Sequence, residues 1–265
     1  MGKVLAVTNQ KGGVGKTTTS VNLAASLVAT KRKVLLIDLD PQGNATMGSG
    51  INKHALESSV YDVLVDEMSI AQARQSTQPG FDLVGANADL TAAEVELLDL
   101  DEKEQRLNRA LEGVRSEYDY ILIDCPPSLN MLTVNALVAS DSVLIPMQCE
   151  YYALEGLTAL LNTIEKIRSV LNPKLEIDGL LRTMYDPRIA LSNQVSSQLT
   201  DHFGDKVYRT IIPRNVRLAE APSHGLPVLE YDARSRGAVC YLALAGELIR
   251  RAEQNKADAR EPLTA

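Results

Sequence analysis

Most of the strand-like runs in this chain are apolar throughout, without the alternation of a half-exposed strand. They lie at residues 4–7, 34–37, 81–84 (a weaker run), 120–123, 143–145, 179–181 and 207–212, and longer helix-like stretches separate them. A strand without alternation is buried on both faces, which is typical of a parallel sheet with helices on either side. The sequence therefore predicts an α/β fold with a mostly parallel central sheet flanked by helices on both faces.

The composition is that of a globular protein. Hydrophobic residues make up 45% and charged residues 23% of the 265 residues, which excludes disordered and fibrous architectures. No linker rich in Pro, Gly or Ser divides the chain. We expect a single domain over residues 1–254, a polar tail over 255–265, and an irregular excursion with short helices over 43–78.

The apolar segments and the cysteines of the sequence indicate the cellular compartment. No run of about 18 apolar residues is present and no charged segment precedes an apolar one at the N-terminus, so neither a membrane span nor a signal peptide is predicted. The three cysteines, Cys125, Cys149 and Cys240, are widely spaced and form no Cys-x-x-Cys pair. This argues against a disulfide framework or a zinc site and favours a reduced, cytoplasmic protein.

A glycine-rich segment lies between the first expected strand and the helix after it. It consists of Lys11, Gly12, Gly13, Val14, Gly15, Lys16, Thr17 and Thr18. Glycines let backbone N–H groups converge on phosphate oxygens, and the helix N-terminus favours negative charge. The segment predicts a phosphate loop in which Lys16 contacts the β and γ phosphates and Thr17 binds Mg²⁺.

The loop departs from the strict P-loop pattern, Gly-x-x-x-x-Gly-Lys-[Ser/Thr]. Gln10 stands at the first glycine position, and an additional lysine, Lys11, lies inside the loop. Two expected strands nevertheless end in carboxylates, Asp38 and Asp40 after one and Asp124 after the other. Ligands bind at the carboxyl edge of open α/β sheets, so Asp124 is the predicted carboxylate that holds Mg²⁺ through water.

These segments together resemble a known family. The phosphate loop, Asp-Leu-Asp-Pro-Gln-Gly-Asn at 38–44, Asp-Cys-Pro-Pro-Ser at 124–128 and Ile-Pro-Arg-Asn-Val-Arg at 212–217 are similar to the ParA group of deviant Walker-A ATPases. Tyr-Tyr-Ala-Leu-Glu-Gly at 151–156 and Glu-Ala-Pro-Ser at 220–223 extend the resemblance over nearly the whole chain. It implies a P-loop NTPase fold and ATP-driven segregation of chromosomes or plasmids with a ParB-like partner.

The resemblance also implies roles for individual residues. Lys11 matches the signature lysine that reaches the partner's phosphates in an ATP-bound homodimer, as an arginine finger does in trans. Asp40 matches the carboxylate that positions the attacking water, and Asp38 lies beside the metal region. Pro213 and Asn215 fall where the family holds adenine. The implied ligands are ATP and Mg²⁺, and the implied activity is slow hydrolysis of ATP.

A competing signal for guanine lies near the C-terminus. Asn255-Lys256-Ala257-Asp258 matches the Asn-Lys-x-Asp pattern that many GTPases use, since its carboxylate accepts from two guanine N–H groups. The match lies in the expected tail and not at the end of a strand. ATP is therefore favoured over GTP.

DNA binding has to come from a local patch, because 34 acidic against 27 basic residues give a net charge of −7. Residues 182–217 carry six basic and three acidic side chains. Such a region favours salt-sensitive, sequence-independent binding to the phosphate backbone of double-stranded DNA. Given the resemblance, Arg188 and Arg217 are the expected contacts, and a nucleoid-associated location follows; a solvated charged face is the plainer interpretation.

Relatives with other functions provide the alternatives. Only seven residues precede Thr8, so we expect no N-terminal helix-turn-helix domain. A membrane-positioning ATPase of the MinD kind would need a basic amphipathic C-terminal helix, but Leu263 is the only bulky apolar residue after Asn255. A P-loop metabolic transferase or ligase would need an acceptor pocket, for which no spare catalytic cluster is evident. The cysteines do not lie in the Gly-rich loops of iron–sulfur reductase relatives.

Overall fold

The computed structural model describes residues 2–258, which are built around one sheet of eight strands. The strand order is β3-β4-β2-β5-β1-β6-β7-β8, and every neighbouring pair is parallel except β3 with β4. The strands are β1 Lys3–Val7, β2 Val34–Asp38, β3 Gln75–Ser76, β4 Asp82–Val84, β5 Tyr120–Asp124, β6 Ser142–Gln148, β7 Glu176–Tyr185 and β8 Val207–Pro213.

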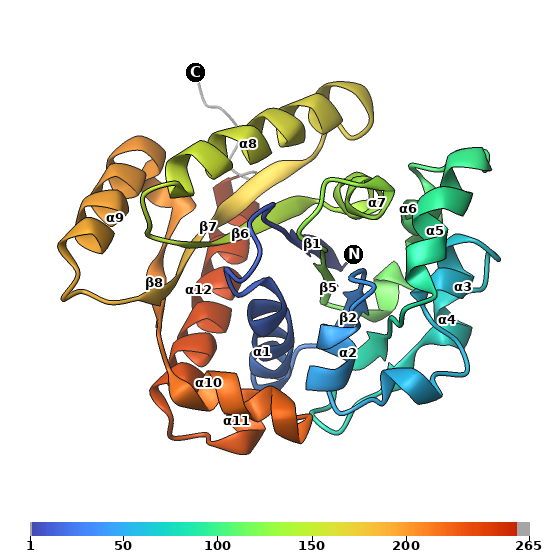
Figure 1. Ribbon diagram of the computed structural model, residues 1–265, viewed down its shortest axis with the longest axis horizontal. Helices are drawn as coiled ribbons and strands as arrows, with labels where there is room; N and C mark the ends of the chain where they lie inside the picture. Colours follow the sequence, from blue (N-terminus) through green and yellow to red (C-terminus); the bar gives the residue numbers. More distant parts are fainter. Residues whose placement is uncertain (1, 259–265) are drawn as a thin grey trace.

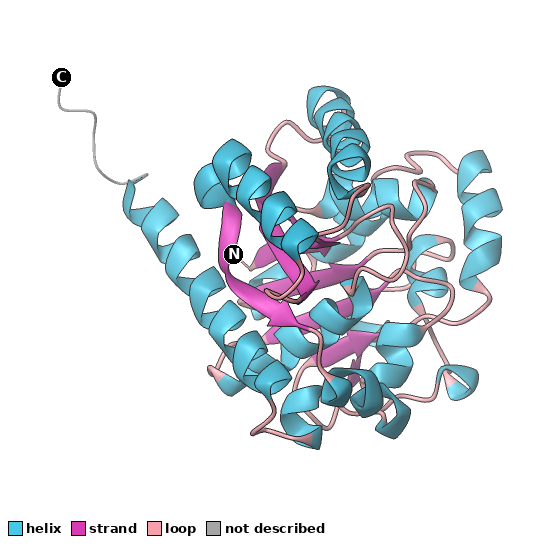
Figure 2. Cartoon of the chain, turned by 60° about the vertical axis from the view of Figure 1, so that its left-hand side comes forward, coloured by secondary structure: helices cyan, strands magenta, loops and turns pink. Residues whose placement is uncertain are grey.

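Helices cover both faces of this sheet, as Figures 1 and 2 show. The α-helices are α1 Lys16–Ala29, α2 Asn44–Gly48, α3 Val60–Leu64, α4 Ile70–Ala73, α5 Leu90–Glu96, α6 Arg106–Glu112, α7 Met131–Ala139, α8 Ala153–Val170, α9 Ala190–Phe203, α10 Val216–Glu220, α11 Val228–Tyr231 and α12 Arg236–Asp258. Short 3-10 turns lie at η1 Lys53–Ala55, η2 Leu97–Asp99, η3 Arg115–Glu117, η4 Gly204–Lys206 and η5 Ala221–His224.

Successive residues of the central strands enter two different cores. In β1, Val4 and Ala6 join the core under α3 and α5 to α9, whereas Leu5 and Val7 join the core under α1, α11 and α12. Each strand therefore needs apolar residues at every position, which is the pattern that the sequence shows. The predicted α/β fold with a mostly parallel sheet is confirmed.

The element boundaries differ from expectation in a few places. Strand β7 spans ten residues, where only 179–181 was predicted, and the two-residue β3 was not predicted. Residues 43–78 contain the short helices α2, α3 and α4, as expected. Helix α12 extends to Asp258 and so includes the guanine-like segment 255–258 in its last turns, away from any strand end. Of the expected tail, residues 259–265 lie outside the described residues.

The parallel register brings the acidic strand ends together. Asp124 at the end of β5 pairs in register with Asp38 of β2 on one side and with Val7 of β1 on the other. The phosphate loop follows Val7, so the predicted loop and the predicted carboxylates meet at one edge of the sheet. Among the described residues, no helix is both long and apolar enough to cross a membrane.

Candidate nucleotide-binding site

The loop between β1 and α1 has the backbone of an anion-binding turn. Gly13 and Gly15 adopt left-handed φ angles of 73° and 86°, which side-chain-bearing residues rarely adopt. A Cβ at Gly12 or Gly13 would meet no atom within 4 Å, so space for a ligand lies beside the loop. No side chain caps the N-terminus of α1. Its first N–H groups are therefore available to a phosphate.

Lys16 lies at the start of α1 with its side chain almost fully buried. Its ammonium donates to the carbonyl oxygen of Lys11 at 3.2 Å, which holds it beneath the loop. Burial lowers the pKa of Lys16, and the charges of Asp124 and Asp40 oppose that shift. A lysine between the loop and two carboxylates is suitably placed to contact a phosphate.

Thr17 and Asp124 form the part of the site that fits a magnesium ion. The Thr17 hydroxyl donates to Asp124 Oδ2 at 2.8 Å, and the Ser20 hydroxyl donates to Oδ1 at 2.8 Å. Asp124 is fully buried, and this burial, with the charge of Asp38, raises its pKa to about 8. A buried carboxylate without an ion pair among the described residues is a strong attractor for a cation.

The described residues contain no group of three or more His, Cys, Asp or Glu side chains that could hold a metal by themselves. Mg²⁺ does not require such a group, because it usually takes one or two protein ligands and completes its shell with water and phosphate oxygens. The hydroxyl of Thr17 and the carboxylate of Asp124 meet that requirement.

Asp38 and Asp40 play different parts in this structure. Both oxygens of the buried Asp38 are occupied: Oδ1 accepts from the Asp40 N–H at 3.1 Å, and Oδ2 accepts from the N–H and hydroxyl of Thr46 at 2.8 Å each. Burial raises the pKa of Asp38 to about 6. Its carboxylate thereby holds the start of α2, and its assignment to the metal stays a prediction.

Asp40 also helps to order the chain after β2. Its Oδ1 accepts from the Gln42 N–H at 2.9 Å, which closes a tight turn ahead of α2. The side chain is 8% exposed, and its charge acts on both Lys16 and Asp124. Asp40 is thus near the phosphate loop, as its predicted role requires.

Lys11 extends from the loop to the exposed segment after β6. Its ammonium forms an ion pair with Glu150 at 2.6 Å, and both side chains are about half exposed. The pair was not predicted from the sequence. The Lys11 side chain can leave this pair at a small cost in free energy, because an exposed ion pair stabilises a protein by only about 0.2–1 kcal/mol.

Three further side chains anchor the loop and were missed in the sequence. The Asn9 side chain donates to Pro146 O at 2.9 Å, the Gln148 amide donates to Gly13 O at 3.0 Å, and the Thr183 hydroxyl donates to Val14 O at 2.8 Å. Gln148 and Thr183 lie near the carboxyl ends of β6 and β7. Polar residues at those strand ends are the signal that would have found them.

Pro213 and Asn215 lie at the end of β8 and before α10. The Asn215 side chain accepts from the Leu218 N–H at 3.3 Å and so caps α10. Both residues are partly exposed. The hydrogen bond of Asn215 does not bear on adenine, so the contact of Pro213 and Asn215 with the base stays a prediction.

The basic region carries less free charge than its composition suggests. Arg188 pairs with Asp186 at 2.6 Å, and hydrogen bonds from Arg188 lower the pKa of Asp186 to about 2. Arg217 pairs with Glu220 at 2.8 Å and with Asp232 at 3.3 Å.

Two other basic residues of this region stabilise the fold: Arg182 donates to Ser196 and Tyr208, and Lys206 donates to Ile177. Arg214 acts on Asp186 through its charge alone and has no ion pair among the described residues.

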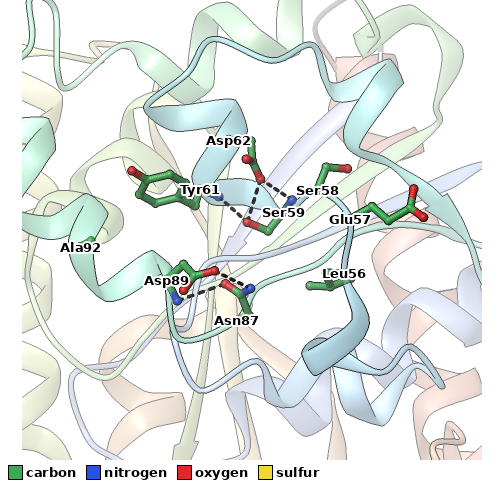
Figure 3. A pocket seen from close by; sticks show the side chains of 9 residues that line it. All are labelled: Leu56, Glu57, Ser58, Ser59, Tyr61, Asp62, Asn87, Asp89 and Ala92. Atoms are coloured by element: carbon green, nitrogen blue, oxygen red, sulfur yellow. Dashed lines mark hydrogen bonds between the residues drawn. The ribbon is translucent and has the colours of Figure 1, made fainter.

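A separate surface hollow of about 370 Å³ lies between the start of α3 and the start of α5 (Figure 3). Its polar groups bond with one another: Asp62 accepts from the N–H and hydroxyl of Ser59, and Asn87 and Asp89 are joined by two hydrogen bonds. These contacts start the helices that follow. The hollow shares no residue with the phosphate loop.

A glycine loop between a buried parallel strand and a helix, with a buried lysine and a Thr–Asp pair beside it, defines a P-loop NTPase. Residues 2–177 match the family model described as an AAA domain. The chain is 57% identical over 249 residues to the sporulation initiation inhibitor protein Soj of Bacillus subtilis (strain 168), covering 94% of this chain and 98% of that protein. It is 53% identical over 260 residues to the chromosome partitioning protein ParA of Caulobacter vibrioides, covering 97% of each. The chain therefore belongs to the ParA/Soj family of chromosome-partitioning proteins.

A solved structure adds a relative with a different name. The cobyrinic acid a,c-diamide synthase from Mycobacterium smegmatis with bound ADP and magnesium is 38% identical, has a TM-score of 0.85 and covers 96% of this chain and 97% of that chain. The fold of the present chain is thus that of a solved P-loop protein over nearly its whole length.

Proposed function

We propose that this protein is an ATP-dependent DNA-partitioning switch. On binding ATP and Mg²⁺ the monomer forms a homodimer, the dimer binds DNA without regard to sequence, and a ParB-like partner accelerates a slow hydrolysis that resets it. The observation that carries the nucleotide part is the Thr17–Asp124 hydrogen bond of 2.8 Å beneath an open glycine loop. The relatives named Soj and ParA support the partitioning part.

Each residue at the loop has a role in hydrolysing ATP to ADP and phosphate. The N–H groups of residues 12–18 bind the phosphates, and Lys16 neutralises charge on the β and γ phosphates. Thr17 and Asp124 would hold Mg²⁺, which supplies charge neutralisation between the β and γ oxygens when bound. Asp40 accepts a hydrogen bond from the attacking water and so aligns it, while Pro213 and Asn215 would contact adenine.

Lys11 links turnover to dimerisation. In the monomer its ammonium is paired with Glu150 on the same chain. A lysine that leaves this pair for the phosphates of a second copy adds the charge that an arginine finger supplies, so the active site is complete only in the dimer. Dimerisation and competence for hydrolysis then become one event.

Exposed aromatic residues beside Lys11 support a contact with a second copy. Tyr151 and Tyr152 directly follow Glu150, are 74% and 68% exposed, and pack edge to face with ring centroids 5.0 Å apart. Exposed aromatic side chains are enriched at protein interfaces. Their position next to the nucleotide site favours a dimer that closes over the phosphate loops.

Duplex DNA is the proposed partner of the surface that carries Arg188 and Arg217. Both arginines already pair with carboxylates, so a monomer offers little net positive charge to a phosphate backbone. In a dimer, arginines of both copies can exchange their exposed carboxylate partners for phosphates of one duplex, so the number of backbone contacts doubles and binding requires ATP. Location on the nucleoid follows from such binding.

The name of the solved relative favours one second candidate, a P-loop amide-forming ligase. Such an enzyme would transfer the γ-phosphoryl group to a carboxylate acceptor before an amine displaces it. A MinD-like membrane function stays a weaker alternative, because Leu263 is the only bulky apolar residue after Asn255.

The deciding experiment measures phosphate release by the purified protein with MgATP alone, with duplex DNA, and with DNA plus a ParB-like protein from the same cell. The partitioning function predicts slow release alone and a marked rise with DNA and partner together. Release that depends on a small carboxylate acceptor, with no response to DNA and partner, would instead establish the ligase.

A further inference from the structure

The side chain of Asn22 on α1 makes two hydrogen bonds, one of them fully buried, that none of the roles above requires. Its side-chain amide donates to Thr18 O at 2.7 Å, and its side-chain oxygen accepts from the Val228 N–H at 2.7 Å. The residue is only 5% exposed. One asparagine therefore bridges the phosphate-binding turn, which contains Thr18, and the first residue of α11.

Helix α11 is only four residues long, and its other end is tied to the basic surface. Asp232 follows its last residue and pairs with Arg217 at 3.3 Å, while the Tyr231 hydroxyl donates to Glu220 at 3.3 Å. A helix this short has little stability of its own and depends on its tertiary contacts. The contacts of Asn22 and Arg217 thus hold opposite ends of one small element.

The chain before α11 also packs against the segment after α2. A Cβ at Gly225 would lie 3.1 Å from the Gly50 Cα, so the two backbones are in close contact. Asp38 holds the start of α2. Segment 225–232 therefore lies against two elements that begin at the nucleotide site, α1 and α2, and against α10, which carries Arg217.

We propose that Asn22 is a positioning residue that couples nucleotide binding at the phosphate loop to the order of α11 and the Arg217 surface. Asn22 touches no phosphate; it acts through Thr18 and Val228. The proposal rests on the proposed function for its ligand, ATP. A nucleotide that fixes the turn around Thr18 then stabilises α11, and by reciprocity an ordered α11 favours nucleotide binding.

The chain provides a matched control at Asn135 on α7. Asn135 donates to Met131 O, four residues back, at 3.1 Å and accepts from the Leu107 N–H of a facing helix at 3.1 Å. It is also fully buried. Asn135 also donates to Lys103 O at 2.7 Å. Asn135→Leu thus removes this bond together with a bridge of the same kind as that of Asn22, but away from the loop.

The experiment measures hydrogen–deuterium exchange over residues 226–233 of the full-length protein, with and without MgATP, together with MgATP affinity. In the wild type and in Asn135→Leu we expect MgATP to slow exchange over this segment. In Asn22→Leu we expect that protection to be lost and MgATP to bind about twofold to tenfold more weakly, the range that one net hydrogen bond carries.

A second variant covers the case in which Asn22→Leu does not fold or does not bind ATP. Val228→Pro removes the N–H that donates to Asn22, at the first position of a helix, where proline is tolerated, and replaces the buried valine side chain with another apolar one. It keeps the Asn22–Thr18 bond, so MgATP should still bind but should no longer protect the segment. Protection of α11 by MgATP in Asn22→Leu or in Val228→Pro, or its absence in a wild type that binds MgATP, would overturn the proposal. A wild type that binds no MgATP would instead overturn the proposed function.

Discussion

At the scale of single residues, the candidate site is organised around Asp124, a carboxyl group whose ionised form is disfavoured by burial. Asp124 is fully buried beside Asp38, and within residues 2–258 two side-chain hydroxyls donate to it, those of Thr17 and Ser20. Burial raises its pKa to about 8. The folded protein thus favours the protonated form of Asp124 unless a cation compensates the charge of its carboxylate, and such a site can cost stability.

This residue predicts a pH dependence of stability in the absence of nucleotide and Mg²⁺. Between its ordinary pKa of 3.8 and about 8, the folded state binds a proton that the unfolded state does not. The free energy of unfolding should therefore fall as pH rises through that window, by up to about 1.4 kcal/mol per pH unit from this group. Urea unfolding at pH 5, 6, 7 and 8 measures the slope.

The Asp124→Asn variant isolates the contribution of Asp124 to the pH dependence of the free energy of unfolding. The variant should unfold at higher urea concentration than the wild type at pH 8, lose most of the slope, and hydrolyse no ATP, because the proposed Mg²⁺ ligand is gone. An unchanged slope in Asp124→Asn would show that other groups cause it.

The Lys11–Glu150 pair yields a second prediction at this scale. Glu150→Gln should shift the ATP-dependent monomer–dimer equilibrium toward the dimer by about twofold to thirtyfold, because two exposed ion pairs of about 0.2–1 kcal/mol each, one per copy, no longer retain Lys11. Lys11→Ala should bind ATP but show no stimulated hydrolysis. Light scattering across an ATP titration measures the first effect. Equal dimerisation of Glu150→Gln and wild type would contradict the role given to the pair.

At the scale of elements, the carboxyl ends of the strands could be predicted to meet, because apolar runs buried on both faces leave few alternatives to a parallel sheet. The predicted parallel sheet therefore brings Asp38, Asp40 and Asp124 to one edge. The anchors Gln148 and Thr183 could not be predicted in the same way. Their contacts depend on the register of β6 and β7 against the loop, which lies more than 130 residues away in the chain.

The remaining errors have local causes. Strand β3 has two residues, too few for a periodic pattern. The ends of β7 include polar positions such as Glu176 and Asp178, so apolar runs alone predicted only its centre. The ion pairs of Arg188 and Arg217 were missed because a charge count over a segment does not reveal which charges already have partners.

The basic surface at the ends of β7 and β8 and on α10 carries the third prediction. Arg188→Glu or Arg217→Glu should abolish ATP-dependent DNA binding without affecting dimerisation. Arg214→Ala, which removes an arginine with no ion pair among the described residues, should lower the slope of log affinity against log salt by about two, one contact from each copy. Filter binding at several salt concentrations measures this.

Lys166→Glu is the matched control, because Lys166 is exposed on α8, which covers the face of the sheet opposite to α10. It should leave DNA affinity and the salt slope unchanged. Should the Arg188, Arg214 and Arg217 variants dimerise and bind DNA like the wild type, the DNA surface lies elsewhere.

At the scale of the whole molecule, the net charge of −7 per copy opposes binding to DNA, so binding depends on the local arginine surfaces that two copies present to one duplex. Association, DNA binding and turnover then depend on one nucleotide. The central claim is therefore that ATP, and not ADP, drives the monomer to a dimer, and that hydrolysis through Asp40 reverses it.

Sedimentation velocity of Asp40→Ala, Lys16→Ala and the wild type in MgATP and in MgADP tests that claim most directly. Asp40→Ala should bind ATP without turnover and sediment as a stable dimer in MgATP but as a monomer in MgADP. Lys16→Ala should remain monomeric in both, because the β and γ phosphates lose their main positive charge. An Asp40→Ala protein that binds MgATP and stays monomeric would contradict the account.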